Sequence, residues 1–142
     1  MEILLVKIKV TKQMNCLLVS NPENQSTQDV MGFLDAEKVA YVSLTDPISA
    51  IEKAQEQHFD LILIDAEPGG VDVDRAIKIF KSCAPKARII VHTNSNSRTL
   101  ESKVRKEKIY YFHVNSFGPE DLKLAIRNAL QNNPSLNENH SI

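Results

Sequence analysis

The stretch FDLILID, at residues 59–65, gives the clearest strand signal in the chain. Its centre, residues 61–64, is wholly apolar, and an apolar run of this length predicts a parallel strand covered on both faces. Other runs of strand length, rich in β-branched or aromatic residues, occur at 16–19, 39–42, 87–91 and 109–112. We therefore expect five strands.

Helical patterns separate these runs. Asp46-Pro47 predicts a helix start, with an N-cap followed by proline at the first helical position. Apolar stripes follow Val73 and Pro119, and weaker helical patterns cover 24–38 and 98–108. Strands that alternate with helices predict a three-layer α/β/α fold with a five-stranded parallel sheet. For it we choose the flavodoxin-like strand order 2-1-3-4-5.

The composition predicts one ordinary globular domain. The chain has 142 residues, a net charge of −1 and 42% hydrophobic residues. Nothing global favours nucleic acid or a membrane, and no stretch predicts a signal peptide or a bilayer span. The two cysteines have no CxxC spacing, which predicts reduced thiols and a cytoplasmic location.

The domain is expected at residues 14–131, between an N-terminal extension and a polar C-terminal tail. In the extension at 1–13, residues 6–11 alternate and predict a short extra N-terminal strand. This strand could cover a sheet edge or pair with a second copy in a homodimer, and the alternative is a disordered leader. Residues 132–142 are polar, and we expect a frayed tail.

The candidate site follows from a rule of open parallel sheets, whose active crevice lies at the carboxyl ends of the strands. The residues that follow or end the predicted strands are Ser20, Asn21, Asp65, Thr93, Asn94, Asn115 and Ser116.

This arrangement resembles the receiver domain of two-component response regulators, carried by the segments at 59–65, 89–93 and 117–122. Receivers have an acidic pair after strand 1, a phosphoacceptor aspartate ending strand 3 and a Ser or Thr ending strand 4. An aromatic residue and a Lys-Pro pair lie around the end of strand 5. The resemblance implies that Asp65 is the phosphoacceptor and that Thr93 and Phe112 occupy the switch positions.

The departures from this family pattern change the expected chemistry. Ser20 and Asn21 replace the acidic pair, Asn115 replaces the lysine, and Asn94 stands where a small residue is usual. Phosphoryl transfer to a carboxylate needs Mg²⁺ and a second cation to neutralise charge. The remaining metal ligands would be Asp65, Asn21 and the backbone of Glu67. We expect weak magnesium binding at best, no other cofactor, and a pseudo-receiver.

Structural interpretations stand beside these roles. Asp65 could cap the loop that follows it, Thr93 could be a satisfied strand-end hydroxyl, and Phe112 is better explained by core packing. Asp72 and Asp74 are typical of helix capping and dipole partners. The four histidines show no ligand spacing, which argues against a metal site.

Three functions are compatible with these features. The first is a stand-alone, non-enzymatic pseudo-receiver that signals by contact with a histidine kinase, a phosphotransfer protein or an effector. The second is a working phosphoacceptor in a phosphorelay, and the third is a flavodoxin-like small-molecule binder, for which no glycine-rich loop is present. The basic segment near residues 98–108 is by default a solvated helix face. It is also a candidate surface for contact with a partner protein, formed by Arg98, Lys103, Arg105, Lys106, Tyr110 and Tyr111.

Overall fold

The strands form one parallel sheet in the order β2-β1-β3-β4-β5, as predicted. The computed structural model describes residues 13–66 and 72–131. The predicted strand at 6–11 and the predicted tail at 132–142 therefore lie outside the described residues. The strands are β1 (Asn15–Val19), β2 (Ala40–Leu44), β3 (Leu61–Asp65), β4 (Arg88–Thr93) and β5 (Tyr111–Val114).

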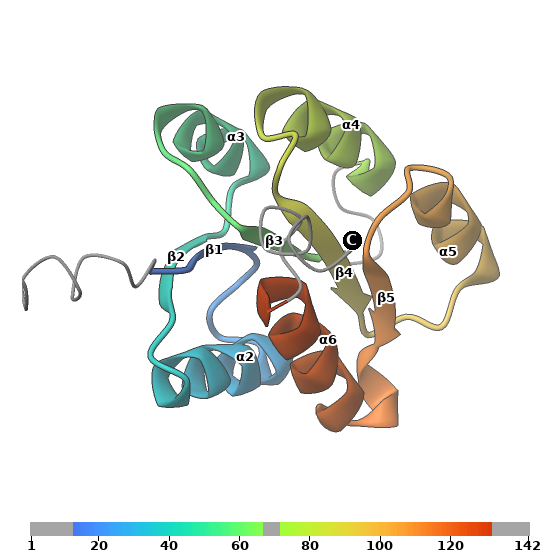
Figure 1. Ribbon diagram of the computed structural model, residues 1–142. Helices are drawn as coiled ribbons and strands as arrows, with labels where there is room; N and C mark the ends of the chain where they lie inside the picture. The colour runs from blue at the N-terminus through green and yellow to red at the C-terminus, as the bar shows by residue number, and fades with distance from the viewer. Residues whose placement is uncertain (1–12, 67–71, 132–142) are drawn as a thin grey trace, which may run out of the picture.

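Helices cover both faces of this sheet (Figure 1). One face carries α2 (Gln25–Ala36) and α6 (Glu120–Gln131), which lie side by side. The other carries α3 (Pro47–Glu56), α4 (Val73–Cys83) and α5 (Arg98–Arg105). A short 3-10 turn, η1 (Asn115–Phe117), leads from β5 into α6. This three-layer α/β/α arrangement confirms the predicted flavodoxin-like fold.

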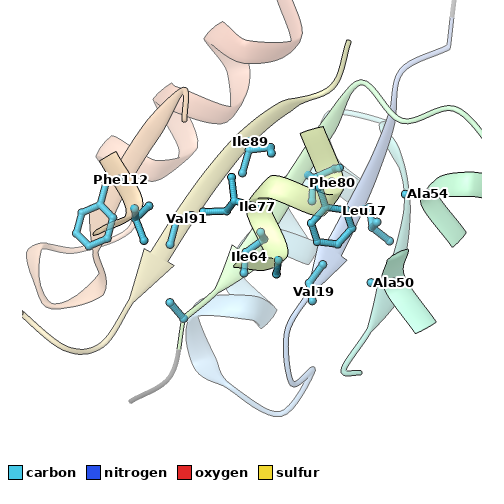
Figure 2. Close-up of a cluster of buried hydrophobic side chains, with 14 of the residues drawn as sticks. Leu17, Val19, Ala50, Ala54, Ile64, Ile77, Phe80, Ile89, Val91 and Phe112 are labelled. Atoms are coloured by element: carbon cyan, nitrogen blue, oxygen red, sulfur yellow. The ribbon is translucent and has the colours of Figure 1, made fainter. Parts of the chain in front are cut away.

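The central strand β3 divides the core into two clusters. Ile62 and Ile64 point toward α3, α4 and α5, and Figure 2 shows part of that cluster around Ile77 and Phe80. Leu61 and Leu63 point to the other face, where α2 and α6 pack. The residues of β3 pair in parallel register with β1 and β4 on either side. Burial on both faces explains why the 61–64 run is continuously apolar.

Some predicted boundaries and caps are wrong. β5 begins at Tyr111, two residues after the predicted start, and the helix predicted at 98–108 ends at Arg105. Lys108 has a φ of 58°, a left-handed conformation that no helix continues through. The Asp46 cap is confirmed by hydrogen bonds from two backbone N–H groups, whereas Asp72 makes no side-chain capping bond.

Within residues 13–66 and 72–131, none of the helices has the length and apolar character needed to cross a membrane. Both cysteines are free thiols, with Cys16 buried in β1 and Cys83 half-buried at the end of α4.

Candidate functional site

The carboxyl ends of β1 and β3 open into a cavity of about 240 Å³. Polar groups from the β1–α2 and β2–α3 connections line it together with apolar residues of α4. The lining residues are Val19, Ser20, Asn21, Asn24, Thr45, Pro47, Ile64, Asp65, Val73, Ala76 and Phe80. Three of the predicted site residues, Ser20, Asn21 and Asp65, therefore share one cavity.

Asp65 is held by a residue that the sequence did not indicate. The side-chain amide of Asn24 donates a hydrogen bond of 2.7 Å to Asp65 Oδ2. Asn24 is the N-cap of α2, yet its side chain makes no capping bond to that helix. An N-cap side chain ordinarily satisfies a helical N–H group, so α2 forgoes that bond while this amide is turned toward the carboxylate.

The positions of the acidic pair carry neutral groups. Ser20 is buried, and Asn21 is exposed with its Oδ1 accepting the backbone N–H of Glu23 at 3.0 Å. This turn occupies one lone pair of the oxygen that was predicted to bind magnesium. Glu67, the other predicted ligand besides Asp65, lies outside the described residues. No group of three metal-binding side chains occurs in the part of the chain that the structure describes.

Thr93 joins the end of β4 to the backbone that follows Asp65. Its hydroxyl, which is fully buried, donates a hydrogen bond of 2.7 Å to the carbonyl oxygen of Ala66. The hydroxyl oxygen of Thr93 in turn accepts the backbone N–H of Ser95 at 3.0 Å. The interpretation as a satisfied strand-end hydroxyl is confirmed.

Asn115, at the family's lysine position, points sideways along the sheet edge. Its amide donates a hydrogen bond of 2.9 Å to Asn94 Oδ1, in the β4–α5 connection. Neither residue lines the Asp65 cavity. The structure thus brings these two predicted site residues together, but separately from Asp65.

A second cavity, of about 340 Å³, is lined by this asparagine pair and by residues at the starts of α2 and α6. The side chain of His113 lines it and is 3% exposed. Its Nε2 lies 2.9 Å from the carbonyl oxygen of Gly118, and its ring stacks on Tyr111. Burial lowers the pKa of His113 below its ordinary value, which favours the neutral ring.

Phe112 belongs to the core. It is 6% exposed and packs in the cluster under α4 and α5, as the core-packing interpretation predicted. The guanidinium carbon of Arg105 lies 5.8 Å from the centre of its ring. Arg105 also bonds to Glu101 of the same helix at 2.7 Å, so its charge is partly compensated.

Five of the six residues of the predicted contact surface are exposed, and Tyr111 is not. Arg98, Lys103, Arg105 and Lys106 are exposed on or next to α5. Tyr110 is 40% exposed and lies against the guanidinium of Arg88. Tyr111 instead packs with the α2–α6 cluster on the opposite face of β5, because successive strand residues point to opposite faces.

Several solved structures with the same fold are receiver domains. The chain is 20% identical, with a TM-score of 0.75, to the signal receiver domain of an HD domain-containing protein from Pseudomonas fluorescens, covering 87% of this chain and 99% of that one. It is 14% identical, with a TM-score of 0.76, to a CheY-like response regulator receiver domain protein from Methanospirillum hungatei, covering 87% and 98%.

A third similar structure is a response regulator protein from Burkholderia pseudomallei with a phosphorylated aspartic acid and a calcium ion. It is 18% identical with a TM-score of 0.64, covering 84% of this chain and 70% of that one. No protein-family model matches the sequence, and the search of curated proteins found no significant match. At these identities the likeness establishes the receiver fold.

Proposed function

We propose that this domain is a receiver-like signalling module that acts through protein contacts, with weak or absent phosphorylation of Asp65. One observation carries the proposal: the carboxylate that would accept phosphate is bonded to a neutral amide, from Asn24. Of the described residues around the Asp65 cavity, none is a lysine or an arginine.

Charge explains why this matters. A phosphoryl group on Asp65 would bring two negative charges into a cavity whose described lining has no cation, and receivers solve that problem with bound magnesium and a lysine. The Asn24 amide contributes only a dipole. Asn115, at the lysine position, is bonded to Asn94 and carries no charge. The described lining therefore offers little electrostatic stabilisation for a phosphorylated state.

The partner is a signalling protein: a histidine kinase, a phosphotransfer protein or a downstream effector. The exposed basic residues of α5, together with Tyr110, favour an acidic partner surface. We propose that the domain has no enzymatic activity. A cytoplasmic location and a homodimer remain predictions.

The second candidate function is a working phosphoacceptor. Asp65 lies at the rim of a cavity at the carboxyl edge of the sheet, and a response regulator of the same fold holds a phosphorylated aspartic acid. In this alternative, magnesium would be held by Asp65 with waters and carbonyl oxygens.

Incubation with acetyl phosphate and magnesium, followed by intact-mass measurement, separates the two candidates. We expect little or no adduct. A stoichiometric mass gain that disappears in Asp65→Asn would establish the phosphoacceptor instead. Asp65→Asn is a suitable control because the new amide oxygen can still accept the hydrogen bond from Asn24.

A magnesium titration tests the electrostatic argument. Restoring the acidic pair as Ser20→Asp with Asn21→Asp should strengthen magnesium binding, because two carboxylates join Asp65 at one cavity. Asn96→Asp, which adds a carboxylate at an exposed position outside that cavity, is the matched control. Equal affinities for the pair variant and the control would show that Asp65 does not face a potential metal site.

A further inference from the structure

The second cavity, of about 340 Å³, is separate from the Asp65 cavity and shares no lining residue with it. It lies at the carboxyl edge of the sheet, where α2 and α6 run side by side and η1 leads into α6 (Figure 1). Its lining residues are Gln25, Ser26, Asp29, Val30, Asn94, His113, Asn115, Ser116, Gly118, Pro119, Leu122 and Lys123.

Small side chains at two positions leave this cavity unfilled. Asn115 is short, and its amide is bonded to Asn94 in the wall of the cavity. Gly118 closes the η1 turn with a φ of 93°, a conformation that favours glycine and adds no side chain. A volume of this size falls within the range of small-molecule sites.

The bonded asparagine pair gives one wall a defined hydrogen-bonding pattern. Since one amide donates to the other, the N–H groups of Asn94 and the carbonyl oxygen of Asn115 remain available to a ligand. Exchanging the oxygen and nitrogen of both amides moves the donors to Asn115 and the acceptor to Asn94, so the pair offers both in either assignment. This pattern complements a ring edge on which an acceptor nitrogen and an amino group are neighbours.

The remaining walls are apolar or uncharged. Val30, Pro119 and Leu122 supply the apolar surface against which a flat ring can lie. A carbonyl oxygen only accepts, so the ring nitrogen of His113 that faces Gly118 carries the proton. The other ring nitrogen of the neutral imidazole is then an acceptor.

The charges of the lining balance. Asp29, bonded to Gln25 at 2.9 Å, and Lys123 are the two charged residues of the described lining. That described lining contains no arginine and no cluster of lysines to recognise a phosphate or polyphosphate group. The lining therefore favours an uncharged ligand.

We propose that this cavity binds an uncharged, purine-sized nitrogen heterocycle, a nucleobase or nucleoside, with its amidine edge against Asn94 and Asn115. Its signalling role rests on the proposed function: where phosphorylation is lost, an occupied cavity beside η1 and α6 gives the domain a second state. Binding itself does not depend on the chemistry of Asp65.

The test is a titration of the isotope-labelled full-length protein with adenine, adenosine, purine and adenosine monophosphate, followed by nuclear magnetic resonance without magnesium or a phosphoryl donor. We expect shifts at the Asn94 and Asn115 side-chain amides and at His113. Purine lacks the exocyclic amino group and should bind about tenfold more weakly than adenine, the value of one hydrogen bond. Adenine and adenosine together distinguish a nucleobase site from a nucleoside site.

Variants locate the site. Asn115→Lys should fill the cavity and abolish binding, and Asn94→Ala should weaken it about tenfold. Asn96→Ala, two residues along the same connection but outside the lining, should bind as the parent does. If Asn115→Lys fails to fold by circular dichroism, Asn94→Ala against Asn96→Ala decides.

Three results would overturn the inference. They are an absence of shifts with both adenine and adenosine up to about 1 mM, shifts that are unchanged in Asn94→Ala, and tighter binding of adenosine monophosphate than of adenosine. Because no phosphoryl donor is present, none of these results affects the outcome of the acetyl phosphate experiment. The proposal for the ligand cavity and the proposal for Asp65 can therefore fail independently.

Discussion

The two ends of β3 carry the same type of side chain in different surroundings. Asp60, directly before the strand, is 3% exposed and accepts the backbone N–H of Asn15 at 2.9 Å. The ring of His58 lies 3.2 Å from its other oxygen. Asp65, the last residue of the strand, is less buried, lines a cavity and accepts the Asn24 side-chain amide.

The role of each aspartate follows from the edge of the parallel sheet at which it lies. At the amino edge, Asp60 fixes the start of β1 against β3, which is a structural task. At the carboxyl edge the strands end in loops and helix starts, so Asp65 faces a space that a ligand or a phosphoryl group could enter. Composition and strand propensity alone do not separate these two residues.

The largest expected effect comes from Asp60→Ala. It leaves the part-buried backbone N–H of Asn15 without this acceptor, which should lower the free energy of unfolding by about 1.5–3 kcal/mol. Urea denaturation monitored by circular dichroism measures this. A loss below about 0.5 kcal/mol would mean that Asp60 has no structural task.

Asp65→Asn should change stability much less, by under about 1 kcal/mol in either direction, because the amide oxygen can still accept from Asn24. The same urea measurement applies. A loss as large as that of Asp60→Ala would remove the distinction between the two ends of β3.

The carboxyl edge should also make stability depend on pH. Burial lowers the pKa of His113 in the folded protein below the ordinary 6.5, so the unfolded chain binds the proton more readily. The stabilisation by neutral His113 is therefore complete above pH 6.5 and is lost as pH falls through the lower folded value. Urea midpoints at several pH values between 7.5 and 5 should fall, and less steeply in His113→Leu; equal slopes in the two proteins would contradict this assignment.

The smallest effect concerns the amino edge. Burial, with the nearby Asp60 carboxylate, raises the pKa of the Cys16 thiol to about 12. A thiol reagent should therefore modify half-buried Cys83 first in the native protein, and Cys83→Ser should be nearly unreactive until unfolded. Rapid modification of Cys16 in Cys83→Ser would show that the start of β1 opens readily.

The alternation of strands and helices could be predicted because it depends on local patterns, and the strand order was then chosen from the few that right-handed crossovers allow. The apolar run at 61–64 and the helical stripes are short-range signals, and the edge rule then selects Asp65, Thr93 and Asn115. The start of β5 was misplaced because Ile109 and Tyr110 have side chains typical of strands, although they precede the strand.

The hydrogen bonds of the site could not be predicted, because they join residues far apart in sequence. Asn24 and Asp65 are separated by 41 positions, and Asn94 and Asn115 by 21. An asparagine before a helix usually indicates a local cap, so the local sequence gives no sign that Asn24 bonds to the carboxylate.

Beryllofluoride mimics a phosphoryl group on an aspartate and so tests whether Asp65 can carry one. Fluorine nuclear magnetic resonance of the protein with beryllofluoride and magnesium would report a bound species, with Asp65→Asn as the control. We expect no bound signal in the parent protein, because the described lining of the Asp65 cavity offers no positive charge. A stoichiometric bound signal that is lost in Asp65→Asn would contradict this expectation.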